Sequence, residues 1–278
     1  MHLYLQGNKV CLGCKKDNSV AIKTEISNQI ATVTLSRPEI HNALNEEMIS
    51  ALTKTFTNLG EDKNVRAIIL KAEGKSFCSG ADLNWMKSMM SCTASENIED
   101  AKKLGNMFKA IDECPKPVIG RIHGAAFGGG VGLISVCDMT VALRQASFAL
   151  SETKIGLVPG VISYFVVQRT GVSFARRYFL TSEKISPEEA FNSGLISAIA
   201  DDEKSLDSVV NNWTESIKRN GPSAVSACKK LICEVSKSNI KDALEFSSKL
   251  IAECRVSKEG QEGMKAFLEK RLPNWIAN

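Results

Sequence analysis

The feature that most constrains the fold is a run of apolar and small residues, 117–133, that three consecutive glycines at positions 128–130 interrupt. Glycines in such numbers weaken a regular helix or strand, so we expect a tight turn between a strand and a helix here. The bare N–H groups of such a turn, and the N-terminus of the helix after it, can hold negative charge. The stretch therefore predicts a site for an anion, or for an oxygen that becomes negative during a reaction.

A second glycine turn narrows the choice of ligand. A phosphate-binding loop needs a Gly-Lys-Ser/Thr ending, and a dinucleotide site needs G-x-G-x-x-G with an acidic residue about 20 positions later. The stretch shows neither pattern. A turn around Gly80, in residues 77–82, follows an apolar strand expected at 66–70. One amide from each of two turns is what an oxyanion hole requires, so the pair favours a bound carbonyl oxygen over two tight crossovers without a ligand.

Composition excludes several classes of protein. Of the 278 residues, 44% are hydrophobic and 24% are charged, which is typical of a folded globular chain. The formal net charge of +4 is small and scattered, and it argues against nucleic acid as a partner. Nine cysteines, an odd number spread along the chain, predict free thiols in a reducing compartment. Cys11 and Cys14 form the one C-x-x-C, without the second pair that completes a zinc site, so no metal is predicted.

Residues 1–18 are interpreted as a loose extension. They lack the apolar centre and the cleavage pattern of a signal peptide, and they contain no arginine, which disfavours a mitochondrial presequence. No apolar run reaches the length of a membrane span. The sequence therefore predicts a cytoplasmic protein, with the mitochondrial matrix as the alternative.

Strands and helices are expected to alternate from residue 20 onward, beginning with a hairpin in residues 20–35. Such alternation predicts a mostly parallel sheet with right-handed crossovers, an α/β fold. The expected strands are 21–26, 30–35, 67–71, 117–122, 139–143 and 146–150, and the helices between them are 46–59, 85–90, 98–111 and 131–137. Strand 117–122 is expected to lead straight into the triple glycine.

Beyond residue 160 the pattern becomes helical. The expected helices are 161–171, 173–180, 186–193, 205–220, 223–236 and 240–270. Residues 255–265 are too polar for the core of a monomer, so we expect the C-terminal helices to be exposed and to self-associate. We divide the chain into an α/β core, 19–200, and a helical oligomerisation region, 201–278.

Several separated blocks give the chain a clear resemblance. They are SRPEIHNAL at 36–44, FCSGADL at 77–83, KPVI at 116–119, GAAFGGG at 124–130, SE at 151–152 with GLVP at 156–159, and EGMKAFLEKR at 262–271. In this order they resemble the enoyl-CoA hydratase/isomerase, or crotonase, superfamily. The resemblance implies a spiral of repeated ββα units that assembles as a homotrimer or a dimer of trimers. It also implies an acyl-CoA thioester substrate and no cofactor beyond the coenzyme A that carries the acyl group.

The resemblance assigns roles to individual residues. The amides of Ala81 and Gly129 would hold the thioester oxygen, and Glu152 would transfer protons. Arg37 and Ala43 would line the adenine and phosphate end of coenzyme A, and Lys270 would approach the phosphates of a neighbouring subunit's ligand. Further residues expected to contact substrate are Gly80, Asp82, Leu83, Gly128, Gly132, Pro159 and Phe267. Asp82 and Asp138 are interpreted as capping or hydrogen-bonding residues rather than acids.

One position departs from the pattern of the hydratases. They commonly carry a first glutamate just after the triple glycine, where this chain has Gly132. A glycine transfers no proton, so Glu152 would serve twice, another group would help, or the reaction would differ. Isomerases of the superfamily work with the single glutamate at the position of Glu152. A hydratase is the leading hypothesis, a Δ3,Δ2-enoyl-CoA isomerase the second, and a non-catalytic protein that binds coenzyme A or RNA the third.

A narrower resemblance favours hydration in leucine or fatty-acid breakdown. The blocks GADLNWM at 80–86, AAFGGGVGL at 125–133, KIGLVP at 154–159 and ARRYFL at 175–180 look like the bacterial methylglutaconyl-CoA hydratase branch. That branch also tends to carry glycine at position 132, where we expect the missing side chain to leave room for a branched acyl group. The cations expected to meet a distal carboxylate are Lys87, Lys154, Arg169 and Arg176.

Overall fold

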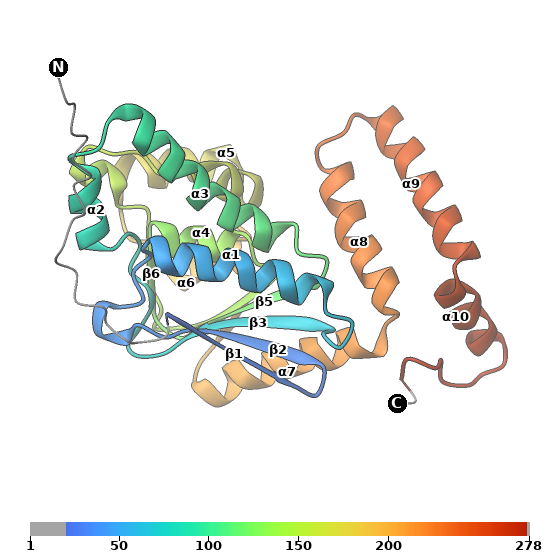
Figure 1. Ribbon diagram of the computed structural model, residues 1–278. Coiled ribbons are helices and arrows are strands. Elements are labelled where there is room, and N and C mark those ends of the chain that lie inside the picture. Colours follow the sequence, from blue (N-terminus) through green and yellow to red (C-terminus); the bar gives the residue numbers. More distant parts are fainter. Residues whose placement is uncertain (1–20, 277–278) are drawn as a thin grey trace, which may run out of the picture.

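The computed structural model describes residues 21–276, which form a mixed sheet covered by helices on both faces (Figure 1). Six strands make the main sheet in the order β1-β2-β3-β5-β7-β9. The hairpin of β1 (Ile22–Ser27) and β2 (Ile30–Leu35) is antiparallel, and every later neighbour is parallel. These later strands are β3 (Ala67–Ala72), β5 (Val118–Ile122), β7 (Met139–Leu143) and β9 (Ala198–Ala200). The predicted α/β class with a mostly parallel sheet is confirmed.

A second, three-stranded parallel sheet was not predicted. It consists of β4 (Ser76–Cys78), β6 (Ala125–Phe127) and β8 (Phe148–Ala149), in that order. The prediction that strand 117–122 leads straight into the triple glycine is therefore wrong, because β5 ends at Ile122 and β6 intervenes. Strands of two or three residues are too short to show a period-two pattern, so β4 and β6 were not predicted. Strand β8 falls within the strand expected at 146–150, which is therefore confirmed.

Helices α1 and α3 pack together on one face of the main sheet and α7 covers the other (Figure 1). Helix α1 (Glu46–Glu61) begins as predicted at Asn45, whose side chain accepts a hydrogen bond of 2.9 Å from the Met48 amide. The other helices and 3-10 turns are η1 (Pro38–Ile40), α2 (Leu83–Met89), α3 (Ala94–Asp112), α4 (Gly129–Ser135), η2 (Glu152–Ile155), α5 (Ser163–Thr181), α6 (Pro187–Asn192), α7 (Glu203–Arg219), α8 (Pro222–Val235), α9 (Ile240–Val256) and α10 (Lys258–Leu268).

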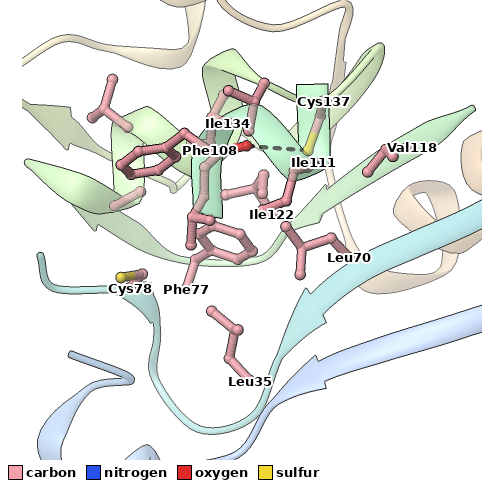
Figure 2. Close-up of a cluster of buried hydrophobic side chains, with 14 of the residues drawn as sticks. Leu35, Leu70, Phe77, Cys78, Phe108, Ile111, Val118, Ile122, Ile134 and Cys137 are labelled. Atoms are coloured by element: carbon pink, nitrogen blue, oxygen red, sulfur yellow. Dashed lines mark hydrogen bonds between the residues drawn. The ribbon is translucent and has the colours of Figure 1, made fainter. Parts of the chain in front are cut away.

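Two apolar clusters fill the spaces on either side of the main sheet. The larger cluster joins the sheet to α1, α3 and α4, and Figure 2 shows part of it, with Leu35 and Leu70 from the strands and Ile134 from α4. In the smaller cluster Leu206 and Val210 of α7 pack with Ile119 and Val141 of the sheet. Helix α4 is therefore buried, and its N-terminus is fixed relative to both sheets.

The last three helices stand beside this body rather than on the sheet (Figure 1). Helix α9 packs on α8, and α10 packs on both. None of residues 255–265 is buried, as predicted from their polarity. Helix α7, which falls in the predicted C-terminal region, packs instead on β5, β7 and β9.

Two further properties follow from the described residues. None of their helices is long and apolar enough to cross a membrane. Within residues 21–276, no three histidine, cysteine or acidic side chains are grouped as a metal site. The Cys11 and Cys14 pair lies outside the described residues.

Candidate active site

Three parallel strands deliver the parts of the site to one edge. β4 and β8 both pair in parallel with β6, the central strand of the small sheet. The carboxyl ends of parallel strands lie at the same edge of a sheet, which is where α/β proteins commonly place their sites. The Gly80 turn follows β4, the triple glycine follows β6, and Glu152 follows β8. The small sheet thus brings together three segments that are far apart in the sequence.

The two glycine turns are in contact. Gly80 has a φ of +94°, and a Cβ atom there would stand 3.0 Å from the Phe127 carbonyl oxygen and 3.7 Å from the Gly129 nitrogen. Only glycine fits such an approach with a positive φ at low cost. Within residues 21–276, the amides of Ala81 and Gly129 donate no hydrogen bond. Gly129 is the first residue of α4, so its N–H has no acceptor inside the helix.

Glu152 lies against the turn at the start of α4. A Cβ atom at Gly128, where φ is +47°, would stand 2.9 Å from Oε1 of Glu152. The 3-10 turn η2 fixes this residue, because the Glu152 carbonyl accepts hydrogen bonds from Gly156 and from Leu157, the latter at 3.0 Å. The carboxylate therefore faces the same turn that presents the Gly129 amide.

The environment of Glu152 favours its protonated form. Oε2 is buried and has no hydrogen-bond partner among the described residues. Burial raises the pKa of this carboxyl above its ordinary value of 4.5, because the charged form loses water. A carboxyl group with a raised pKa and an oxygen without a hydrogen-bond partner is suited to accept a proton and to return it.

The space beside Gly132 is closed. A Cβ atom at this position would stand 2.5 Å from Cγ2 of Ile162 and 2.8 Å from Cζ of Phe108. The expectation that Gly132 leaves room for a branched acyl group is therefore wrong, since two buried apolar side chains occupy that room. A carboxylate is not accommodated there either. Glu152 is thus the one acid that the structure places at this turn among residues 21–276.

Arg37 and Asp82 form an ion pair at the edge of the site. The guanidinium donates to the Ala43 carbonyl at 3.1 Å and to Oδ2 of Asp82 at 3.2 Å. Oδ1 of Asp82 accepts from the Asn84 amide at 2.8 Å and caps α2, which confirms its interpretation as a capping residue. Asp138 is also a hydrogen-bonding residue, with Oδ2 2.7 Å from the Val118 nitrogen. A contact between Arg37 or Ala43 and coenzyme A stays a prediction.

The other predicted substrate contacts are distributed around these turns and on the C-terminal helices. Leu83 is 81% exposed beside the Gly80 turn, and Pro159 is buried in the loop after η2. Phe267 is 82% exposed at the end of α10, and Lys270 follows it with a φ of +54°. Because α10 makes its main contacts with α8 and α9, neither residue is brought to the turns within one chain.

The candidate cations differ in their availability. Arg169 donates to the carbonyls of Cys137 and Gly194, where it stabilises the C-terminal end of α4, so it is already engaged. Lys87, Lys154 and Arg176 are exposed and form no ion pair among the described residues.

Four residues that sequence reasoning missed shape this site. Phe108 and Ile162 close the space beside Gly132, Leu44 packs under Gly129, and Asn42 ties the neighbouring loops together. Phe108 and Ile162 lie far from Gly132 in the sequence, so their contact with it is visible only in three dimensions. Leu44 and Asn42 lie in the block at 36–44, whose letters carried the resemblance without indicating a role for these two side chains.

Comparison with known proteins shows the family of this chain. The family model described as enoyl-CoA hydratase/isomerase matches residues 25–278. The chain belongs to the enoyl-CoA hydratase/isomerase family. A curated enoyl-CoA hydratase of Alternaria alternata is 40% identical over 221 residues, covering 77% of this chain and 71% of that protein. The (E)-benzylidenesuccinyl-CoA hydratase of Thauera aromatica is 31% identical over 254 residues, covering 91% of this chain and 97% of its own.

Solved structures of the enoyl-CoA hydratase/isomerase family share the fold. A crystal structure of an enoyl-CoA hydratase from Shewanella pealeana has a TM-score of 0.88 at 37% identity, covering 92% of this chain and 96% of that one. A family member from Legionella pneumophila has a TM-score of 0.85 at 39% identity, covering 92% and 98%. The family model and these structures therefore agree on the family and on the fold.

Proposed function

We propose that the protein adds water across the double bond of a 2-enoyl-CoA thioester, with Glu152 as its single acid and base. The observation that carries this proposal is the contact of the Glu152 carboxylate with the turn that presents the Gly129 amide. The amides of Ala81 and Gly129, which lack acceptors within residues 21–276, would receive the thioester oxygen. Relatives named as enoyl-CoA hydratases support the reaction class.

The steps balance with one carboxyl group. Ionised Glu152 takes a proton from water while the water oxygen bonds to the β-carbon of the substrate. The electron pair of the double bond moves onto the thioester oxygen, where the two amides stabilise the enolate; one such donor is typically worth about 3–4 kcal/mol. Protonated Glu152 then gives its proton to the α-carbon, and the thioester carbonyl re-forms. The raised pKa of Glu152 suits it to both transfers.

A branched substrate with a distal carboxylate, such as 3-methylglutaconyl-CoA, is our proposal for the acyl group. The blocks at 80–86 and 154–159 support it, and so does a relative named for a succinyl-CoA derivative. The unpaired cations Lys87, Lys154 and Arg176 could meet the distal carboxylate. Since Gly132 provides no space, the branch would be accommodated elsewhere.

The second candidate function is a Δ3,Δ2-enoyl-CoA isomerase, because the space beside Gly132 is closed. Isomerisation of a 3-enoyl-CoA needs only one group, which removes a proton from the α-carbon and returns it to the γ-carbon. The apolar wall of Phe108 and Ile162 removes the place for a second carboxylate and so favours this alternative. A role limited to binding coenzyme A or RNA would leave the buried carboxyl group of Glu152 without a use.

We further propose that the chain works as a homotrimer or a dimer of trimers. Its C-terminal helices expose large apolar side chains, which monomers rarely leave in such number on adjacent helices. They include Ile232, Ile240, Leu244, Val256, Phe267 and Leu268. Light scattering during gel filtration tests the state, and a monomer would contradict it.

Mass spectrometry with a panel of thioesters tests the reaction. Purified protein is incubated with 3-methylglutaconyl-CoA, crotonyl-CoA and a 3-enoyl-CoA in water enriched in heavy oxygen. We expect one heavy water to be added, with 3-methylglutaconyl-CoA converted fastest. A shift of the double bond without a gain of water would establish the isomerase, and the absence of any conversion would favour a binding role.

A further inference from the structure

Asn42 is a buried residue whose side-chain amide uses both of its N–H groups and its oxygen in hydrogen bonds. Its Nδ2 donates to the carbonyls of Glu73 and Ser76, both at 2.9 Å, and its Oδ1 accepts from the Arg37 amide at 2.8 Å. The residue is 0% exposed and has a φ of +55°, in the left-handed region that asparagine tolerates better than most residues. A buried amide whose N–H groups and oxygen all have hydrogen-bond partners fixes the segments that it joins.

The segments that Asn42 joins lead to the Gly80 turn. Ser76 begins β4, the strand that ends just before Gly80. On the other side of Asn42, three main-chain hydrogen bonds tie residues 41–44 to the turn. They run from Ser79 N to His41 O at 2.9 Å, from Leu44 N to Gly80 O at 2.7 Å, and from Asp82 N to Leu44 O at 2.9 Å.

These bonds bracket Ala81 and leave its own N–H free. The N–H of Leu44 donates to Gly80 and its carbonyl accepts from Asp82, the residues before and after Ala81. The Leu44 side chain packs under the triple-glycine turn. A Cβ atom at Gly129 would stand 2.8 Å from Cδ1 of Leu44. Leu44 is therefore in contact with both turns, and the position of Leu44 depends on the segment that Asn42 fixes.

We propose that Asn42 is a positioning residue that, through Leu44, sets the Ala81 amide relative to the Gly129 amide for catalysis. The inference rests on the proposed function, in which both amides hold the thioester oxygen. Such donors have to be kept within about 0.5 Å of the productive geometry. A displacement of about 1 Å at a reacting group can cost about 100-fold in rate.

The test uses two variants and a matched control in the full chain. Asn42→Asp keeps the shape and the left-handed backbone but removes both N–H donors and places carboxylate oxygens against two carbonyls. Asn42→Gly keeps the backbone conformation and removes the side chain. Asn28→Asp is the control, because Asn28 also has a positive φ, of +48°, but is exposed in the hairpin between β1 and β2.

Steady-state kinetics and infrared spectroscopy provide the readouts. For each variant we measure kcat and KM with the best substrate of the panel. We also measure the C=O stretch of a saturated acyl-CoA carrying carbon-13 at the thioester carbon. Donors aimed at the oxygen lower that frequency, so the shift on binding reports the oxyanion hole directly. Loss of overall stability alone would not change the shift of the bound ligand.

We expect both Asn42 variants to lower kcat at least about tenfold, with a smaller change in KM, and to reduce the carbonyl shift. Asn28→Asp should match the wild type in all three quantities. Unchanged kcat and carbonyl shift in folded Asn42 variants, or a rise confined to KM, would overturn the positioning role. Absence of turnover and of a carbonyl shift in the wild type would overturn the proposed function itself, and this inference with it.

Discussion

Glu152 and Gly128 are in direct contact: a Cβ atom at residue 128 would stand 2.9 Å from Oε1 of Glu152. The backbone of Gly128, with φ of +47° and ψ of −114°, is one that side chains disfavour. Glycine is thus required here for two reasons, the path of the chain into α4 and the space that the carboxylate occupies.

Gly128→Ala should therefore impair activity more than stability. The backbone conformation costs about 1–3 kcal/mol of unfolding free energy, and displacement of the carboxylate costs about 100-fold in kcat. Gly171→Ala is the control, because Gly171 has a φ of +80° with nothing within 4 Å of an added Cβ atom. Equal losses of activity in the two variants would argue against the contact with Glu152.

A methyl group at Gly132 should collide with the apolar wall. We expect Gly132→Ala to lower the free energy of unfolding by about 1–3 kcal/mol through overpacking against Ile162 and Phe108. Ile162→Ala removes the nearer contact, so in that background the cost of Gly132→Ala should shrink. A denaturation double-mutant cycle measures the difference. Gly105→Ala, which would meet only Val161 at 3.5 Å, is the control, and additive effects at 132 and 162 would refute the wall.

The raised pKa of Glu152 predicts a specific pH dependence of stability. Because the pKa in the folded state lies above that in the unfolded state, the folded state binds more protons between the two values. Stability therefore falls as the pH rises through the folded-state pKa. Glu152→Gln should melt at a higher temperature than the wild type at pH 7, and the difference should vanish below the ordinary value of 4.5. Glu25→Gln, on the exposed face of β1, is the control; a constant difference at all pH values would contradict the burial of this charge.

Lys229 should link the C-terminal helices to the body that carries the site. Its Nζ lies 2.7 Å from Oδ2 of Asp138, just after α4, and the two side chains are only 15% and 28% exposed. Lys229→Met would leave Asp138 partly buried without its cation, at a cost of about 1–3 kcal/mol. Hydrogen exchange should then rise along α8 more than along α1, whereas Lys241→Met on α9 should have no effect. Unchanged exchange in α8 would show that the ion pair does not hold it.

Long elements with a regular pattern could be predicted from the sequence. The apolar runs that became β3, β5 and β7 and the helical spacing behind Asn45 each carry their own local signal. In the small sheet only β8 has such a signal, within the strand expected at 146–150. Strands β4 and β6 have three residues each and are defined by pairing between distant segments.

Some features of the site could also be predicted from the sequence, and others could not. The glycine turns and Glu152 stand out in the sequence, and a turn after a strand is a local property. Phe108 and Ile162, which come from two other segments of the chain, fill the space beside Gly132. Because the sequence does not show this contact, the glycine was interpreted as leaving open space. The bonds of Arg37 to Asp82 and to the Ala43 carbonyl also become visible only in the folded chain, while its contact with coenzyme A stays a prediction.

The measurement that tests the central claim most directly is the turnover of Glu152→Gln, set beside its affinity for a saturated acyl-CoA. A glutamine keeps the size of the side chain but transfers no proton in either step. We predict that turnover of every thioester in the panel falls below detection while the dissociation constant for the saturated acyl-CoA changes by less than about tenfold. Retained conversion in this variant would show that Glu152 is not the acid and base of the reaction.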